Sequence, residues 1–395
     1  MHLRALTLLT GATLSIASPG PNHNAPSPPH LPSWTLLNHT ASTARFRGLS
    51  PVSELVAWVS GTNGTVLKTE DGGSTFLSVG PSTADTKDET PVSWLEFRDI
   101  QAFSATHAVI LSIGPGSDSR VYFTVDGGKN WVRSFTNREA GAFYDCFAFD
   151  GHGGKGIHGL AMSDPVDGKF RLIETFDSGA TWKIVDYAQE KRRMPPAKEG
   201  EAGFAASGTC IATDARGRWY MATGGAGPDG RIFRSEDDGR DWAVSANSTI
   251  PGSASGGVFS VQFLDEHRGI AVGGDFENPT GSKDNAAFST DGGKTWQPST
   301  KFPAGYRSGS AWVVSGPKES CSGGGDEKKL RDMALAVGPT GSDFTLDAGR
   351  TWQKFDDGSF DSVACVPAKG KAKGKGKGRV CWASGQGGRV GKLLL

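Results

Sequence analysis

The sequence predicts an all-β fold, a seven-bladed β-propeller whose ring is closed by an N-terminal strand, and three observations support this prediction. A short motif that combines an acid, a glycine and an aromatic residue occurs six times, at intervals of 51 to 60 residues. An apolar strand and a glycine-rich turn precede the motif in repeated form. The composition, with 56 glycines and 11 tryptophans among 395 residues, is typical of short strands joined by tight turns.

The six motifs share an aspartate two residues before a glycine, followed by Trp or Phe. A repeat of this length corresponds to one supersecondary unit, such as a four-stranded blade. In each turn the glycine supplies a positive φ and the carboxylate accepts backbone hydrogen bonds, while the aromatic residue anchors the outer strand on a neighbouring sheet. We therefore expect structural roles for the aspartates. They are Asp71 (TEDGGSTF), Asp126 (TVDGGKNW), Asp177 (TFDSGATW), Asp237 (SEDDGRDW), Asp291 (STDGGKTW) and Asp347 (TLDAGRTW).

A seventh blade is predicted at the C-terminus. The segment VCWASGQGGRVGKLLL, residues 380–395, repeats the strand, turn and strand, but no seventh motif follows it. The missing outer strand is expected from Trp34–Leu37, which matches the strands that follow the other motifs. Closing the ring in this way removes exposed sheet edges.

These motifs are Asp-boxes, and the chain resembles the BNR/Asp-box β-propellers. Across residues 34–395 it is most similar to the family of photosystem II stability and assembly factor-like propellers, which have seven blades. The segments that carry this resemblance include WVSGTNGTVLKTEDGG, LEFRDIQAF, AFYDCFAF, GEAGFAASGT and AVGPTGSDFTLDAGRTW. The resemblance implies a rigid disc that binds a protein or another ligand.

The ligand-binding face follows from the strand order. If each blade runs from the axis outwards, the Asp-boxes join its third and fourth strands, and the starts of the innermost strands lie on the opposite face. Loops on a rigid scaffold usually carry function, so we expect a ligand at this polar channel mouth. A channel that is polar only to stay solvated is the alternative. The candidate ligand-binding residues are Arg47, Arg98, Asp99, Tyr144, Asp145, Glu201, Tyr306, Arg307 and Asp361.

The favoured function is a binding scaffold for a protein or an acidic ligand, with the three arginines supplying charge. The alternative is a glycoside hydrolase or glycan-binding protein, because sialidases also carry Asp-boxes. In that alternative the arginines would clamp a carboxylate, and Tyr306, Glu201 and Asp145 or Asp99 would act on the glycosidic bond. The sialidase Arg-Ile-Pro motif is missing, and sialidases have six blades. Catalytic residues are therefore not assigned, and an enzyme is the less favoured prediction.

The N-terminus predicts secretion. Residues 1–17 combine a basic start, an apolar run and small residues suited to signal-peptide cleavage, and residues 18–33 form a Pro-rich linker. In a secreted eukaryotic protein the sequons at Asn38, Asn63 and Asn247 are candidate glycosylation sites.

Five cysteines leave one unpaired in an oxidising compartment. Cys365 and Cys381 flank one hairpin and are the first choice for a disulfide. Cys146 and Cys210 lie in apolar strands, where buried free thiols are expected. Cys321 lies in a segment that reads as a loop insertion.

Several partners are not expected. The net charge is zero, with 42 basic and 42 acidic residues, so no overall field favours nucleic acid or anionic lipid. The basic run 369–379 reads as a solvated loop within the last blade. No segment after the leader is suited to span a membrane. His152 and His158 lack further metal ligands, and no helix follows the glycine turns to hold a phosphate. We expect a monomer without a metal or cofactor.

Overall fold

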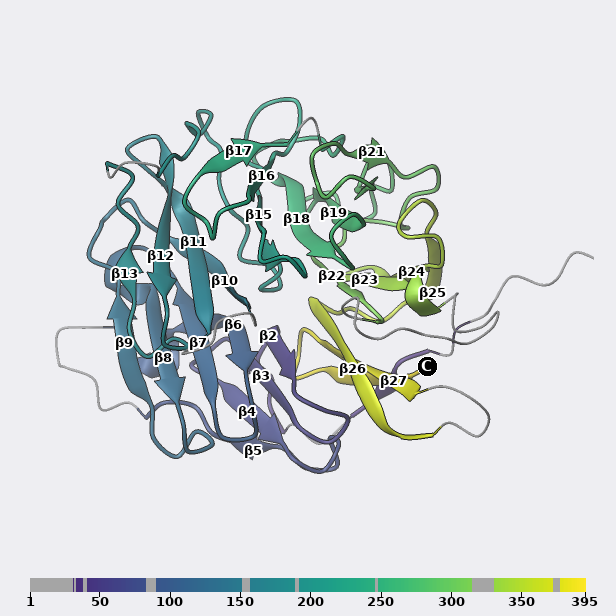
Figure 1. The fold of residues 1–395 in the computed structure, drawn as a ribbon. Helices are drawn as coiled ribbons and strands as arrows, with labels where there is room; N and C mark the ends of the chain where they lie inside the picture. The colour runs from purple at the N-terminus through teal and green to yellow at the C-terminus, as the bar shows by residue number, and fades with distance from the viewer. Residues whose placement is uncertain are drawn as a thin grey trace, which may run out of the picture. The chain divides into compact units, whose positions relative to one another are not determined.

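Seven antiparallel sheets of four strands each surround a central axis (Figure 1). The structure is a computed structural model that describes residues 31, 33–37, 41–82, 90–150, 157–188, 192–245, 248–314, 330–371 and 377–395, without the side chains of 369–371 and 377. Short 3₁₀ turns at Val92–Trp94 and Gly116–Asp118 interrupt a chain whose described regular structure is almost entirely strand. The prediction of an all-β, seven-bladed propeller is confirmed.

Each blade is built from four strands, which follow one another from the axis outwards. Blade 1 consists of β2 (Phe46–Pro51), β3 (Ala57–Gly61), β4 (Val66–Thr69) and β5 (Leu77–Ser78). Blade 2 consists of β6 (Glu96–Ala102), β7 (Ala108–Ile113), β8 (Arg120–Thr124) and β9 (Val132–Thr136). Blade 3 consists of β10 (Tyr144–Asp150), β11 (His158–Val166), β12 (Lys169–Thr175) and β13 (Lys183–Ile184). Blade 4 consists of β14 (Ile211–Thr213), β15 (Trp219–Ala222), β16 (Ile232–Ser235) and β17 (Trp242–Val244). Blade 5 consists of β18 (Gly256–Phe263), β19 (Gly269–Asp275), β20 (Ala286–Ser289) and β21 (Gln297–Pro298). Blade 6 is β22 (Gly309–Trp312), β23 (Ala334–Gly338), β24 (Gly341–Thr345) and β25 (Gln353–Asp356), and blade 7 is β26 (Ser362–Lys371), β27 (Lys377–Ser384), β28 (Val390–Leu394) and β1 (Thr35–Leu36).

The N-terminal strand closes the ring, as predicted. In β1, Thr35 and Leu36 pair with Lys392 and Gly391 of β28. The preceding residue, Trp34, is buried, and its indole Nε1 donates a hydrogen bond of 2.9 Å to Ser342 Oγ of blade 6. The first strand therefore completes blade 7 and also ties it to blade 6.

The Asp-boxes lie in the turns between the third and fourth strands. In the first box, Asp71 Oδ1 accepts the backbone N–H of Thr75 at 2.9 Å, and Thr69 Oγ1 donates to the same oxygen at 2.9 Å. The other five aspartates accept the equivalent N–H at 2.8 to 3.0 Å. Gly73 has a φ of +92°, which glycine adopts without steric cost. The structural role predicted for this turn is confirmed.

The inner strands all begin on the face opposite the Asp-boxes. Phe46, the first residue of β2, pairs with Gly61 at the glycine-rich turn, whereas Ala57 pairs with Thr69 next to the Asp-box. We call the face where the inner strands begin the mouth. Aromatic residues at these starts pack between blades, and Phe46 and Phe97 are fully buried there.

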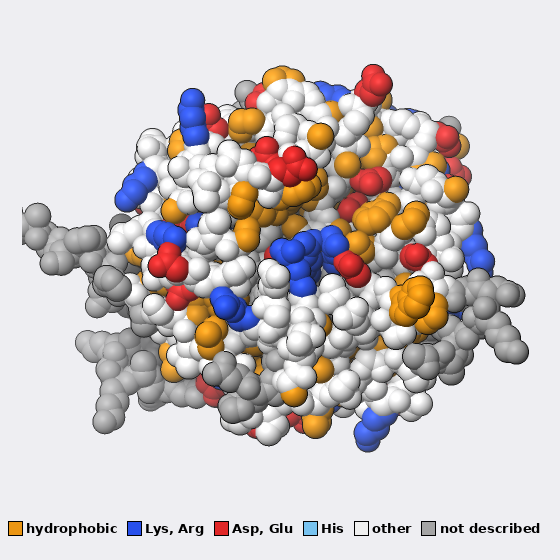
Figure 2. Space-filling view, turned by 180° about the vertical axis from the view of Figure 1, so that it is seen from behind, with side chains coloured by type: hydrophobic (Ala, Val, Ile, Leu, Met, Phe, Trp, Pro, Cys, Tyr) orange, Lys and Arg blue, Asp and Glu red, His pale blue; other side chains and the backbone are white. Residues whose placement is uncertain are grey.

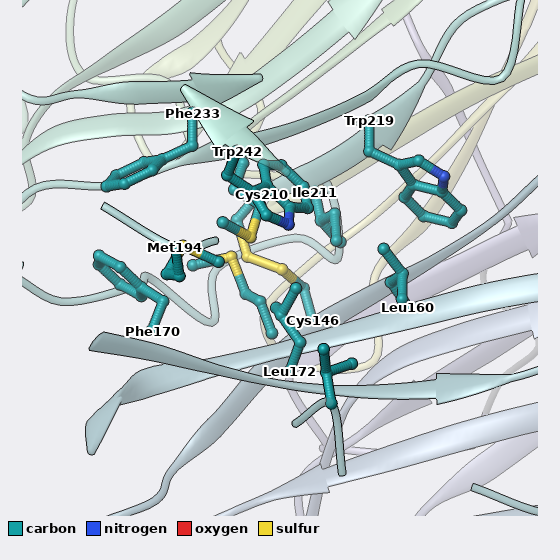
Figure 3. Close-up of a cluster of buried hydrophobic side chains, with 13 residues drawn as sticks. Cys146, Leu160, Phe170, Leu172, Met194, Cys210, Ile211, Trp219, Phe233 and Trp242 are labelled. Carbon is teal, nitrogen blue, oxygen red and sulfur yellow. A yellow bond between two sulfur atoms is a disulfide. The ribbon is translucent and has the colours of Figure 1, made fainter. Parts of the chain in front are cut away.

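Two disulfides are present among the described cysteines. Cys365 and Cys381 are opposite each other in β26 and β27 and form the expected bridge. Cys146 and Cys210 also form a disulfide, so the expectation of free thiols there was wrong (Figure 3). The two residues are 64 positions apart, but Cys146 in β10 and Cys210 just before β14 have their Cα atoms 6.2 Å apart, within the core between blades 3 and 4.

Other predictions fall partly outside the described residues. Asn63 is exposed in its turn, whereas Asn38, Asn247, Cys321, His152 and the leader 1–17 lie outside them, as does nearly all of the linker 18–33. In the basic run 369–379, residues 369–371 end β26 and residues 377–379 begin β27, so these parts are strand rather than the expected loop, and residues 372–376 are not described. In the part of the chain that the structure covers, no helix is long and apolar enough to cross a membrane.

Candidate functional site

A segment of blade 4 crosses the channel just inside the mouth. We call residues 203–209, which precede β14, the crossing segment. Its contacts reach inner strands, or the residues that lead into them, in all six other blades. A segment that touches every other blade must lie across the axis.

Blades 1 to 3 hold the middle of the crossing segment through charged side chains. The carbonyl oxygen of Ala205 accepts hydrogen bonds from Arg47 Nη1 and Arg98 Nη1, each at 3.1 Å. The Asp145 carboxyl group lies beside Gly203, and the nearby backbone N–H of Ala205 partly offsets the rise in its pKa. Gly203 N donates to Asp164 Oδ1 at 2.8 Å. Two arginines and two carboxyl groups therefore position two residues of the segment.

Blades 5 to 7 hold it through hydroxyl and carbonyl groups. Ser207 Oγ donates to the Ser308 carbonyl at 2.7 Å, and Ser362 Oγ donates to the Ser207 carbonyl at 3.3 Å. Thr209 Oγ1 donates to Ser260 Oγ at 2.7 Å. The crossing segment is thus held in place across the channel by hydrogen bonds on both sides.

Three arginines gather above this segment. Arg45 forms a two-point ion pair with Asp361, through Nε at 2.8 Å and Nη2 at 2.6 Å. Arg98 binds Glu96 through the same two nitrogens, at 2.8 and 2.6 Å. Among the described residues, Arg47 forms no ion pair, and its contact is the Ala205 carbonyl. We call Arg45, Arg47 and Arg98 the arginine trio.

The field around Arg47 differs from that of its two neighbours. Burial, together with the positive charges of Arg98 and Arg45, lowers the pKa of Arg47 to about 10. The hydrogen bond that Arg45 donates to Asp361 raises the pKa of Arg45 instead. Arg47 is still protonated at neutral pH, so it is a half-buried cation without a carboxylate partner.

Acidic groups on the inner strands lie below the trio and are deeply buried. Asp99 accepts the backbone N–H of Ile100 and of Phe147, each at 2.8 Å, and burial raises its pKa well above the usual value. Burial and the nearby Asp164 likewise raise the pKa of Asp145. Asp99 thus binds the backbone of the inner strands, and the two carboxyl groups lie beside Gly208 and Gly203 of the crossing segment.

The structure places three other candidate residues away from the trio. Arg307 is fully buried and pairs with Asp343 of blade 6, with Nε to Oδ2 at 2.7 Å. Glu201 pairs with Arg231 of its own blade. Tyr144 is buried in the core between blades 2 and 3. The predicted convergence of three arginines with tyrosine and glutamate therefore does not occur in this geometry.

Tyr306 is buried in a small hydrophobic cluster with Phe259 and with Ala206 of the crossing segment. Its ring packs on Phe259 with centroids 4.7 Å apart, and its hydroxyl is near enough to the trio for Arg47 to act on its pKa. Sequence reasoning missed Arg45, which precedes the aromatic residue of its strand, and Ala205 of the crossing segment. The only sequence signal for that segment was GEAGFAASGT, which stands before an inner strand without a repeat pattern of its own.

Below the crossing segment, the channel continues as a cavity of about 300 Å³. It is lined by later residues of the inner strands, such as Leu49, Gln101 and Gln262, and by Ser207 and Gly208 of the crossing segment. The crossing segment thus separates this cavity, on the Asp-box side, from the trio at the mouth. In the described residues, no group of three or more His, Cys, Asp or Glu side chains is placed to hold a metal ion.

Basic side chains gather at the centre of one face of the ring, with hydrophobic and acidic side chains around them (Figure 2). Basic side chains in this position can bind an anionic group, and the ring around them is rigid. Chemically, the mouth offers guanidinium groups for a carboxylate or phosphate.

Comparisons with known proteins agree with the fold. The BNR/Asp-box repeat family matches residues 287–298. The structure of YCF48 bound to D1 peptide has 15% sequence identity and a TM-score of 0.55, covering 92% of this chain and 99% of that one. YCF48 from Cyanidioschyzon merolae has 15% identity and a TM-score of 0.52, with the same coverage.

A propeller of another type is also similar. The WD40 repeats of RRP9 have 11% identity and a TM-score of 0.57, covering 93% of this chain and 99% of that one. A comparison with curated proteins found no match at the sequence level. The chain is a seven-bladed β-propeller with Asp-boxes in its turns, one of which matches the BNR/Asp-box repeat family, and its fold is similar to that of YCF48.

Proposed function

We propose that this propeller is a scaffold that binds an acidic segment of a partner protein at the mouth, with Arg47 as the central contact. The observation that carries the proposal is the environment of Arg47. Its two neighbours each hold a carboxylate, whereas Arg47 is paired only with a neutral carbonyl. A half-buried cation without a counter-ion is unfavourable, and a carboxylate from a partner relieves this cost.

The similarity to a peptide-binding propeller supports this proposal. YCF48, whose fold this chain shares, has been solved bound to D1 peptide. Similarity of fold does not transfer a ligand, so the partner class rests on the charge at the mouth. A binding scaffold is favoured over a sialidase-like enzyme because Glu201 and Arg307, two residues named for that chemistry, pair with Arg231 and Asp343 instead.

We further propose that the protein is secreted and acts as a monomer, with residues 1–17 as signal peptide, 18–33 as linker and 34–395 as the binding domain. Two disulfides support an oxidising compartment, because such bonds persist outside the cytosol. The exposed Asn63 is then available for glycosylation, and Asn38 and Asn247 remain proposed sites.

Affinity capture with immobilised protein tests the binding function. The Arg47→Gln, Arg98→Gln double variant removes two charges from the trio, and Arg240→Gln is the matched control because Arg240 is an exposed Asp-box residue on the other face. We expect a protein from culture medium or cell-surface extract to bind the wild type and Arg240→Gln, and to be lost from the double variant. Equal capture by all three proteins would refute a role for the mouth.

A further inference from the structure

Aromatic side chains form a ledge beside the arginine trio. The ring of Phe204 stacks on Phe259 with centroids 4.0 Å apart and an interplanar angle of 9°. Phe276, which follows β19, meets both rings edge-on at 6.2 and 6.3 Å. Phe259 is only 2% exposed, but Phe276 is 47% exposed. We call Phe204, Phe259 and Phe276 the aromatic ledge.

The ledge and the trio are adjacent through the crossing segment. Phe204 belongs to the ledge, and the next residue, Ala205, accepts hydrogen bonds from Arg47 and Arg98. Consecutive Cα atoms are about 3.8 Å apart. Tyr306 adds a second link, because its ring packs on Phe259 and its hydroxyl lies in the field of Arg47. A ligand can therefore reach both surfaces with side chains that are close neighbours in its own sequence.

Acidic side chains restrict what the ledge accepts. Asp275 and Glu277 flank Phe276, and the Asp275 carboxylate accepts the N–H of Glu277 at 2.9 Å. A second acidic side chain over the ledge is repelled by these charges, whereas an aromatic ring is attracted to the exposed face of Phe276. The trio and the ledge thus differ in the side chain that each accepts.

We propose that the mouth recognises a pair of neighbouring side chains in the partner, one carboxylate that binds Arg47 and one aromatic ring that packs on Phe276. This inference rests on the proposed function, since it requires an acidic segment at the trio. It adds the chemical class of the partner's segment: an acidic residue with an adjacent aromatic residue. An exposed aromatic surface beside an unpaired cation suits both groups at once.

Isothermal titration calorimetry with three synthetic peptides tests this pairing. The peptides are acetylated and amidated forms of Gly-Phe-Asp-Phe-Gly, Gly-Ala-Asp-Ala-Gly and Gly-Phe-Asn-Phe-Gly. Phenylalanine on both sides of the acid makes the result independent of the direction in which the chain binds. The protein variants are Arg47→Gln, Phe276→Ala and the matched control Phe176→Ala, which changes another exposed phenylalanine, in the third Asp-box.

We expect the wild type and Phe176→Ala to bind the Phe-Asp-Phe peptide about tenfold more tightly than the Ala-Asp-Ala peptide. Phe276→Ala should bind both acidic peptides alike, with the affinity that the wild type shows for Ala-Asp-Ala. Arg47→Gln should lose both acidic peptides, and the Phe-Asn-Phe peptide should bind none of the proteins.

Two other results distinguish a failure of this inference from a failure of the proposed function. If Phe276→Ala still prefers the Phe-Asp-Phe peptide tenfold while Arg47→Gln loses binding, the ledge proposal fails and the acidic site remains. If the wild type binds neither acidic peptide, or Arg47→Gln binds them unchanged, both proposals fail. Unchanged melting temperatures of the variants show that a loss of binding is not a loss of folding.

Discussion

Replacing Trp34 by alanine tests whether the N-terminal strand holds the ring together. The Trp34 side chain is 6% exposed, and its ring lies 5.5 Å from Phe360 and 6.0 Å from Phe355. Its backbone N–H also donates to Asp356 at 3.1 Å. One residue therefore links β1 to blade 6 as well as to its own blade.

The expected loss of stability follows from this burial. Truncating a buried Trp to Ala costs about 3–5 kcal/mol, which includes the lost hydrogen bond from Nε1 to Ser342. For a domain of roughly 360 residues the unfolding entropy is about 0.8 kcal/mol per kelvin, so the melting temperature should fall by about 5 °C.

Far-UV circular dichroism during urea and thermal unfolding measures this change without depending on tryptophan fluorescence. Leu36→Ala is the matched control, because Leu36 lies in the same strand but is 46% exposed. It should cost less than about 1 kcal/mol. A loss below about 1 kcal/mol for Trp34→Ala, or separate unfolding of one blade before the others, would refute the role of the strand in closing the ring.

Three further predictions concern the interior. Arg307→Leu leaves Asp343 buried without its cation and should cost about 3–5 kcal/mol in urea unfolding; a stability equal to that of the exposed control Arg240→Leu would contradict this. Non-reducing peptide mapping should recover Cys146 joined to Cys210, and the longer loop predicts that removing this bridge costs about 4 kcal/mol, against about 3 for Cys365–Cys381; free thiols at both positions would overturn the assignment. Burial raises the pKa of Asp164 to about 6, so this group favours the folded state below about pH 4 and loses that contribution as the pH rises through 6. Melting curves of wild type and Asp164→Asn from about pH 4 to 8 should diverge in this window, and parallel curves would show that Asp164 is not shifted.

The ring itself could be predicted because its signals are local and repeated. Each Asp-box specifies its turn through residues that lie close together in the sequence, and the strand at Trp34 resembles the strands after the other boxes. The interior of the channel could not be predicted in the same way. The crossing segment has no period, and its contacts join residues 39 to 158 positions apart.

The pattern of an aromatic followed by a polar residue was also insufficient to predict which polar side chains reach the channel at the mouth. It applies equally to Arg47, which reaches the crossing segment, and to Arg307, which is directed to Asp343, 36 positions away. The direction of such a side chain depends on the residue with which it pairs, and that residue lies elsewhere in the chain. Cys146 and Cys210 show the same limit, because only the ring places their two strands side by side.

The central claim is that Arg47 receives a carboxylate from a partner. A crystal structure of the protein with the acetylated and amidated Gly-Phe-Asp-Phe-Gly peptide tests this most directly. We expect the aspartate carboxylate within hydrogen-bond distance of the Arg47 guanidinium, above the crossing segment. A peptide seated in the cavity on the Asp-box side, or an Arg47 that keeps only its contact with Ala205, would contradict it.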